Sequence, residues 1–219
     1  MKTLAFGVTE YVLLAISLLV IIALLIVLFL SLRKKLLQRY ALVNYFYPII
    51  RKTAVYHDFY LINKLEMKLN NHESLFIDHV LFGNKYIYVI NDNLYKGTLS
   101  GKPQDSKWIL KNKQGEEEII DSPFLKTKQT MQKLSLRTLI DMNTFIGITL
   151  VSTDTKITDL DVNDSHNFII DTRDFMKLVL RIEGRDIRTL NPEELKKRVH
   201  EIDGLNLRRE KGHKWPKKK

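Results

Sequence analysis

The hydrophobic pattern divides the chain into one long apolar segment and a remainder in which the apolar runs are short. Residues 12–32 read VLLAISLLVIIALLIVLFLSL and contain no charged residue, glycine or proline. At about 1.5 Å per helical residue, such a segment spans a hydrocarbon core of about 30 Å. The pattern therefore predicts a transmembrane helix from Val12 to Leu32.

Two other structures fit this segment less well. A buried helix of a soluble core is rarely so uniformly apolar. A cleaved signal peptide has a shorter apolar region, of about 7 to 15 residues, followed by a small-residue cleavage site. Here the apolar segment runs directly into Arg33, Lys34 and Lys35. We therefore expect the helix to be retained in the mature protein.

The charges that flank the segment predict its orientation. Before it, only Lys2 and the amino terminus are positive, whereas four basic residues follow it closely: Arg33, Lys34, Lys35 and Arg39. Cytoplasmic flanks of membrane helices carry the excess of basic residues. We expect a single-pass protein of the cell membrane with its N-terminus outside and its C-terminal domain in the cytoplasm.

The remainder of the chain is long enough for one domain of ordinary size and too short for two. We expect five regions: a short extracytoplasmic N-terminus (1–11), the transmembrane helix (12–32), a basic juxtamembrane and helical connector (33–57), a cytoplasmic domain (58–204) and a basic tail (205–219). In the connector, apolar and aromatic residues at helical spacing predict one or two helices with a break at Pro48.

Short apolar runs at 59–69, 75–83, 86–91 and 94–101, separated by segments rich in Asn and Gly, predict a β-meander. Residues 102–121 are polar and predict a loop or an exposed hairpin that turns at Gly115. A helical period then covers 124–142, strands are expected at 144–152 and 166–171, and a helix at 173–181. A last helix begins with Asn191 as cap, Pro192 at the first position and Glu194 closing a capping box, and it runs to about Ile202.

These elements predict an α/β or α+β domain in which a central mixed sheet is flanked by helices. The chain has no cysteine, so disulfides and Cys-ligated metal sites are excluded. Its net charge of +10 favours an anionic partner, either membrane lipid or nucleic acid. The candidate anion-binding residues lie beside the membrane helix and in the tail: Arg33, Lys34, Lys35, Arg39, Lys214, Lys217, Lys218 and Lys219.

One buried strand contains an unexpected acidic residue. Asp78 lies in the sequence FIDHVLFGNKYIYVI, and a buried carboxylate costs several kcal/mol unless it is paired, hydrogen-bonded or bound to a metal. This sequence, the Lys96-Gly97 and Ser100-Gly101 steps, Trp108 and Pro123 resemble the NERD (nuclease-related) domain over residues 59–152. That family is related to restriction-endonuclease-like nucleases of the PD-(D/E)xK type.

The resemblance implies metal-dependent phosphodiester hydrolysis, in which an Asp and a Glu hold Mg²⁺ and a Lys two residues after the Glu positions water. Asp78 matches the first carboxylate and His79 follows it as in the family. The Glu-x-Lys positions, however, hold Asn91 and Asn93, which removes both required charges. The chain also lacks the family's Gln three residues after Pro123, as well as its earlier helix with Gly and Glu.

An alternative keeps the chemistry if Asp92 replaces the missing Glu and Lys96 supplies the cation. On a regular strand, Asp92 points to the opposite face from Asn91, so this alternative requires a β-bulge. Asp78 and Asp92 are therefore the candidate catalytic residues, Asp78 as a remnant and Asp92 as the alternative ligand. Mg²⁺ is expected only in this alternative.

Other chemistry is not indicated. His72, His79, His166, His200 and His213 have no mutual spacing typical of a metal site, and no Gly-rich phosphate loop or nucleophile motif is present. We expect no metal, no small-molecule cofactor and no family-type catalysis. The sequence predicts a non-catalytic binding or scaffold module at the cytoplasmic membrane face, with lipid and either nucleic acid or another membrane protein as partners. A metal-dependent nuclease with a rearranged site is the alternative.

Overall fold

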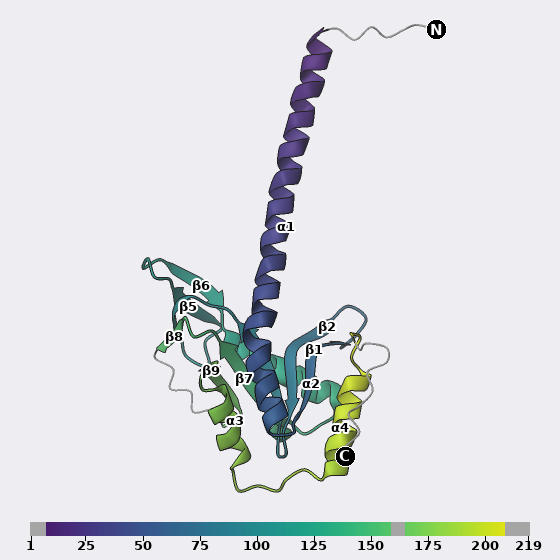
Figure 1. Cartoon of the computed structure of the whole chain (residues 1–219), viewed down its shortest axis with the longest axis vertical. Helices are drawn as coiled ribbons and strands as arrows, with labels where there is room; N and C mark the ends of the chain where they lie inside the picture. The colour runs from purple at the N-terminus through teal and green to yellow at the C-terminus, as the bar shows by residue number, and fades with distance from the viewer. Residues whose placement is uncertain (1–7, 159–164, 209–219) are drawn as a thin grey trace, which may run out of the picture. The chain divides into compact units, whose positions relative to one another are not determined.

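The structure is a computed structural model that describes residues 8–158 and 165–208, without the side chains of residues 8–12 and 34–44. The chain divides into two compact units, residues 1–44 and residues 45–219. The first unit is formed by most of one long helix, α1 (Val8–Tyr56), whose last residues belong to the second unit. Each unit is described by itself below (Figure 1).

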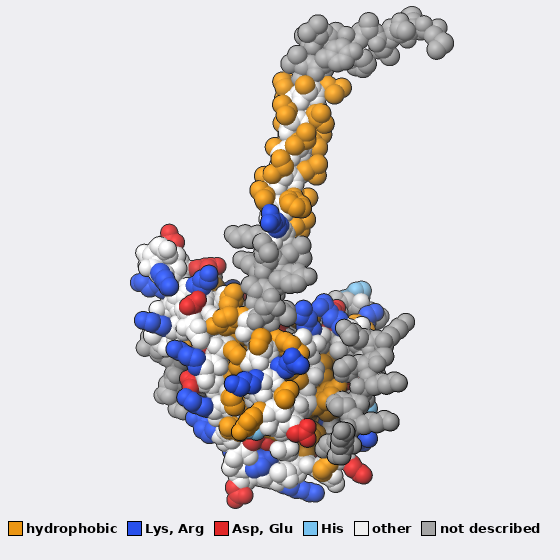
Figure 2. Space-filling view, viewed as in Figure 1, with side chains coloured by type: hydrophobic (Ala, Val, Ile, Leu, Met, Phe, Trp, Pro, Cys, Tyr) orange, Lys and Arg blue, Asp and Glu red, His pale blue; other side chains and the backbone are white. Residues whose placement is uncertain are grey.

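The apolar segment of α1 has the properties of a membrane span. Residues Leu13–Arg33 have a mean hydropathy of 3.5 and are long and apolar enough to cross a bilayer. Their large hydrophobic side chains are exposed, and Figure 2 shows apolar side chains along this whole part of the helix. A helix that is apolar all round and uncovered by protein is suited to a hydrocarbon environment.

Pro48 does not interrupt α1, so the expected break in the connector is wrong. The helix continues through Pro48 to Tyr56. A proline inside a helix removes one hydrogen bond and crowds the preceding turn. Here Pro48 lies on the exposed side, while Phe46, Ile50 and Ala54 are buried at helical spacing. Burial of this apolar stripe offsets the cost of the proline.

The second unit has two mixed sheets flanked by helices, which confirms the predicted α+β class. The larger sheet has the order β1-β2-β3-β7-β9. Its first three strands are antiparallel neighbours, whereas β3, β7 and β9 run parallel. The strands are β1 (Tyr60–Lys68), β2 (Ser74–Phe82), β3 (Ile87–Asn93), β7 (Phe145–Val151) and β9 (Asn167–Asp171).

Helices cover both faces of this sheet. On one face, α2 (Pro123–Thr138) and α4 (Pro192–Gly204) contribute Met131 and Ile202 to a core with Val80 and Val89. Because strand residues alternate, Leu81, Tyr88 and Ile148 belong to the opposite face, where they are fully buried. Figure 1 shows residues 45–56 of α1 and α3 (Phe175–Glu183) on that face.

The smaller sheet, which accompanies the central one, has the order β6-β5-β4-β8. Its strands are β4 (Gly97–Ser100), β5 (Lys107–Lys111), β6 (Glu117–Asp121) and β8 (Thr155–Thr158). The run at 94–101 therefore leaves the meander, and β8 was not predicted, because four polar and apolar residues give no clear period. Leu99, Trp108, Phe124, Val151 and Ile169 form the core under this sheet.

Two further local expectations are settled by the structure. Residues 102–121 form an exposed hairpin of β5 and β6, which turns at Gly115 with a φ of 90°. Asn191 caps α4, but its side chain accepts from the backbone N of Glu193 at 3.1 Å. Glu194 does not complete a capping box and instead has Oε1 3.6 Å from an Arg198 nitrogen. A 3₁₀ turn, η1 (Met142–Thr144), connects α2 to β7.

Candidate functional site at the edge of β2, β3 and β7

The candidate site lies where β2 and β3 separate. The two strands pair from Phe82 opposite Ile87 to His79 opposite Ile90. Beyond this point the backbones of β2 and β3 no longer pair. The Asp78 side chain bridges them instead, since its Oδ2 accepts a hydrogen bond from the backbone N of Asp92 at 2.9 Å. Asp78 therefore has a structural partner that explains how a carboxylate is accommodated in this strand.

An irregularity in β1 and β2 orients the residues next to the site. Lys64 has a left-handed φ of 57° and lies between the pairs Asn63–His79 and Leu65–Ile77. The two-residue alternation of inward-facing side chains along β2 is interrupted here. Ile77 and Val80 pack into the same core although they are three positions apart. His79 is thereby turned to the opposite face of the sheet.

Asn91, which the resemblance puts where a nuclease would have its metal-binding Glu, connects β3 to α2. Its Nδ2 donates to Oγ1 of Thr127 at 3.1 Å. Thr127 in turn donates to the carbonyl of Pro123, and Thr149 of β7 donates to Thr127 Oγ1 at 2.8 Å. These side chains are all buried. Asn91 therefore belongs to a closed hydrogen-bond network that fixes the first turn of α2 on the sheet.

Asn93, at the position of the family's Lys, is also engaged by neighbours. Its Nδ2 donates to the Asn91 carbonyl at 3.2 Å, and its Oδ1 accepts from the Tyr95 hydroxyl at 3.3 Å. An amide in this position carries no charge. Lys96, the cation of the alternative, is exposed.

Asp92 points to the face opposite Asn91 and pairs with His79. Its Oδ2 lies 2.8 Å from Nε2 of His79, and the two side chains are only 5% and 3% exposed. The ring of Tyr47, from α1, stacks on the His79 ring at a centroid distance of 6.2 Å. β3 retains regular alternation at this point, so Asp92 does not reach the face on which Asn91 lies.

Burial dominates the electrostatics of this pair. Loss of solvent raises the pKa of the Asp92 carboxyl to about 6, while the hydrogen bond and charge of His79 act in the opposite direction. Asp78 adds a smaller contribution that also raises the Asp92 pKa. Asp92 Oδ1 and His79 Nδ1 are buried without a protein partner.

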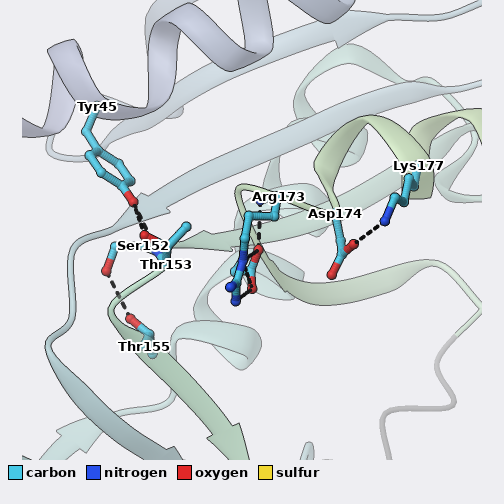
Figure 3. Close-up of polar contacts among 8 residues, drawn as sticks. Tyr45, Ser152, Thr153, Thr155, Arg173, Asp174 and Lys177 are labelled. Carbon is cyan, nitrogen blue, oxygen red and sulfur yellow. Dashed lines mark hydrogen bonds and ion pairs between the residues drawn. The ribbon is translucent and has the colours of Figure 1, made fainter.

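The adjacent edge of the parallel strands is occupied by hydrogen bonds among protein side chains (Figure 3). The hydroxyl of Tyr45 lies 2.8 Å from Thr153 Oγ1 and accepts from the Thr153 backbone N at 3.0 Å. Ser152 Oγ and Thr155 Oγ1 are 3.1 Å apart, and both donate to the Tyr95 carbonyl. This edge therefore serves to hold α1 and the loop between β7 and β8.

The residues present do not fit the divalent metal that the family resemblance implies. Asn91 directs its amide N, a donor, toward Thr127, and Asp92 lies on the other face beside His79. Asp78 remains as a single carboxylate with one oxygen already bonded to the Asp92 N. Among residues 8–158 and 165–208, no group of three or more His, Asp or Glu side chains is arranged to hold a metal ion.

Most of the predicted anion-binding residues lie outside the described parts of the structure. Of the juxtamembrane group, only the side chain of Arg33 is described, and it is exposed. The side chains of Lys34, Lys35 and Arg39 lie outside the described residues, as do all four predicted residues of the tail: Lys214, Lys217, Lys218 and Lys219.

Sequence reasoning missed the residues that occupy the candidate site. Thr127 and Thr149 looked like ordinary polar residues of a helix and a strand, and nothing in their spacing indicated contact with Asn91. The His79–Asp92 pair depends on the irregularity at Lys64, which a sequence pattern does not show. The signal available was the Asp-His step itself, because two polar residues in a buried strand require partners.

The fold and the site define a mixed α+β domain in which a buried polar network joins Asn91, Thr127 and Thr149. The family model of the nuclease-related domain, NERD, matches residues 40–151. This match covers half of the chain, and the protein belongs to the NERD family. Comparisons with curated proteins and with solved structures give no significant match.

Proposed function

We propose that this protein is a single-pass membrane protein whose NERD domain acts as a non-catalytic binding or scaffold module at the cytoplasmic membrane face. Its candidate partners beyond lipid are nucleic acid brought to the membrane and another membrane protein. The regions expected from the sequence, with a connector at 33–57, a domain at 58–204 and a basic tail at 205–219, are part of this proposal.

One observation carries the proposal. The two positions that hold charges in the resembling nucleases are occupied by Asn91 and Asn93, and both amides donate hydrogen bonds within the fold. Without a carboxylate at position 91, the site lacks an anionic oxygen ligand for Mg²⁺ at that position. Without a cation at position 93, no side chain there would stabilise the charge that develops during phosphate cleavage.

The alternative is a nuclease with Asp92 as a rearranged metal ligand. Its support is that Asp78 and Asp92 are neighbours, joined by the Asp78 Oδ2–Asp92 N hydrogen bond. Against it, the Asp92 carboxylate is buried beside His79 on the face opposite Asn91. The alternative would require both residues to leave their present partners.

A cleavage assay separates the two functions. Full-length protein in detergent micelles is incubated with single- and double-stranded DNA and RNA in Mg²⁺ or Mn²⁺, beside the Asp78→Asn variant. The proposal predicts no metal-dependent cleavage above that of Asp78→Asn. Cleavage that is lost in both Asp78→Asn and Asp92→Asn would overturn it and support the alternative.

Membrane orientation is tested by labelling introduced cysteines. Because the chain has no cysteine of its own, each introduced cysteine is its sole reactive thiol. We place single cysteines at Thr3 and at Leu139, which is 90% exposed, in intact cells. The proposal predicts that a membrane-impermeant maleimide labels position 3 directly and labels position 139 only after the cells are permeabilised. The reverse pattern would contradict a cytoplasmic domain.

A further inference from the structure

The outer face of the β5–β6 hairpin combines exposed isoleucines with paired charges. Because strand residues alternate, Trp108, Leu110 and Ile120 point inward and belong to the smaller sheet's core or pack against it. The outer hairpin face is formed by three directly opposed pairs: Lys107–Asp121, Ile109–Ile119 and Lys111–Glu117.

The two isoleucines in the middle of this face are not covered by the described residues of the chain. Ile119 is 74% exposed and Ile109 is 42% exposed, although they are directly opposite each other. A cross-strand pair of β-branched residues leaves an apolar strip that water solvates poorly. Hairpin faces turned to solvent usually carry polar residues at such positions.

Charged pairs border the isoleucines on both sides. Lys107 Nζ lies 2.5 Å from Asp121 Oδ1, and Lys111 Nζ lies 3.2 Å from Glu117 Oε1, with all four side chains at least half exposed. Basic and acidic side chains accordingly lie together over β5 and β6 in Figure 2. All the lysines are on β5, and the acidic groups that face them are on β6.

This arrangement is complementary to itself. A two-fold axis parallel to the strands places β5 of one copy over β6 of another. Each β5 residue of this face then lies opposite a β6 residue of the other copy. Lys107 faces Asp121, Ile109 faces Ile119 and Lys111 faces Glu117, which are the same pairs that lie side by side within one hairpin. We propose that the outer hairpin face binds the same face of a second copy of this chain.

Pairing of the two chains along the β6 edges is disfavoured by the same residues. An antiparallel β6–β6 pair centred on Ile119 would place Glu117 opposite Asp121 of the other copy, at both ends of the strand. Like charges directly opposite one another destabilise a strand pair. The charges therefore favour association through the hairpin faces over extension of the sheet.

The face is smaller than a standard stable interface, which buries about 1,600 Å². We therefore expect association where the chains are concentrated in one bilayer, since confinement raises the effective concentration of a weak contact. The inference thus rests on the membrane anchoring proposed above. Flotation of the protein-containing vesicles shows whether the protein is bound to the membrane. It therefore distinguishes failure of the membrane anchor from failure of the contact between two copies.

The first test uses cross-linking of single cysteines in the full chain reconstituted in lipid vesicles. Ile119→Cys places a thiol in the outer hairpin face, and Leu139→Cys places one at a still more exposed position after α2. Because Ile119 faces Ile109 of the other copy, the two thiols of Ile119→Cys lie diagonally across the axis, and a short bis-maleimide is used to bridge them. The proposal predicts a cross-linked dimer for Ile119→Cys and little or none for Leu139→Cys. Equal dimer yields from the two floated samples would overturn the proposal.

The second test changes the charges in the Ile119→Cys background. Lys107→Asp gives a face with acidic residues at both 107 and 121, and Asp121→Lys gives a face with lysines at both. Each variant alone should lose the dimer, whereas a mixture of the two should recover it, because opposite charges then face each other across the axis. Recovery also shows that both variants are folded. Unchanged dimer yield in each variant alone, or loss without recovery in the mixture, would refute the proposed contact.

Discussion

Gly83, at the turn between β2 and β3, has no room for a side chain. A Cβ at this position would lie 2.3 Å from Glu183 Oε1 and 2.9 Å from Cε2 of Tyr88. Glu183 cannot easily move away, because Oε1 accepts from the Tyr88 hydroxyl at 2.6 Å and Oε2 accepts from the backbone N of Asn84 at 3.0 Å and of Lys85 at 3.1 Å. The end of α3 thus explains why glycine is required at position 83.

Substituting Gly83→Ala should therefore destabilise the domain by about 1–3 kcal/mol, because the added methyl group displaces the Glu183 carboxylate. Chemical denaturation of the full chain in detergent micelles, followed by circular dichroism, measures the change. Gly204→Ala is the matched control, since nothing lies within 4 Å of its Cβ position. A similar small effect for both variants would show that the turn tolerates a side chain.

Asp92 makes stability depend on pH. Its pKa of about 6 in the folded protein exceeds the value of about 4 of an unfolded Asp, so between these pH values the folded state binds more protons. A raised carboxyl pKa means that protonated Asp92 is favoured in the folded state and that the ionised form opposes folding. The stabilisation that protonation provides is lost as the pH rises from about 4 to about 6.

Asp92→Asn removes this titration while leaving a side chain of nearly the same shape. Relative to Asp92→Asn, the free energy of unfolding of the unmodified chain should rise as the pH is lowered from about 7 to about 4. Urea titrations of both proteins at several pH values measure the difference. A constant difference over this range would mean that Asp92 is ionised in the fold with an ordinary pKa.

At the scale of elements, two tyrosines place the end of α1 on the domain. Tyr45 reaches Thr153 in the loop after β7, and Tyr47 stacks on His79 of β2. Tyrosines that follow a membrane helix suit either the membrane interface or a packed helix. Their contacts in the fold favour the packed role.

Tyr45→Phe removes the acceptor of the Thr153 backbone N–H and the partner of its hydroxyl. We expect a loss of about 1 kcal/mol in the free energy of unfolding, since one partner of each hydrogen bond is deleted. Tyr56→Phe, whose residue is 76% exposed, is the control and should be nearly neutral. Thermal or chemical unfolding of the full chain compares the two, and equal effects would show that the Tyr45 hydroxyl contributes nothing to stability.

The sequence predicted the long buried elements and missed the short or irregular ones, for physical reasons. β2, β3 and β7 contain long apolar runs, and α2 has a helical period, so the sequence pattern of these elements indicates their burial. β8 has four residues, and its pairing with β4 is a contact between distant parts of the chain. The continuation of α1 through Pro48 depends on tertiary burial that local propensity does not contain.

The candidate site was predicted in part. Asn91 and Asn93 were singled out by the family resemblance, and regular alternation along β3 separates Asn91 from Asp92. The partners of these residues could not be predicted, because Thr127, Thr149 and His79 come from other elements. The face on which His79 lies depends on the left-handed backbone of Lys64, and a lysine gives no signal of such a conformation.

At the scale of the whole molecule, the net charge is concentrated at the two ends of the domain sequence. Residues 45–208 contain 24 Lys and Arg and 23 Asp and Glu, so the domain itself is nearly neutral. The excess comes from the residues that follow the apolar segment and from the tail, 209–219. This distribution supports an anionic partner for the chain ends and gives no support to a strongly basic nucleic-acid cleft in the domain.

Metal binding tests the central claim, that the NERD fold persists here without its catalytic set. Mg²⁺ and Mn²⁺ are titrated into the full chain in detergent micelles by isothermal calorimetry, beside Asp78→Asn. The account predicts that the two proteins give the same heats, with no specific site that depends on Asp78. A saturable site that is lost in Asp78→Asn would contradict it and indicate that a metal centre survives at the junction of β2 and β3.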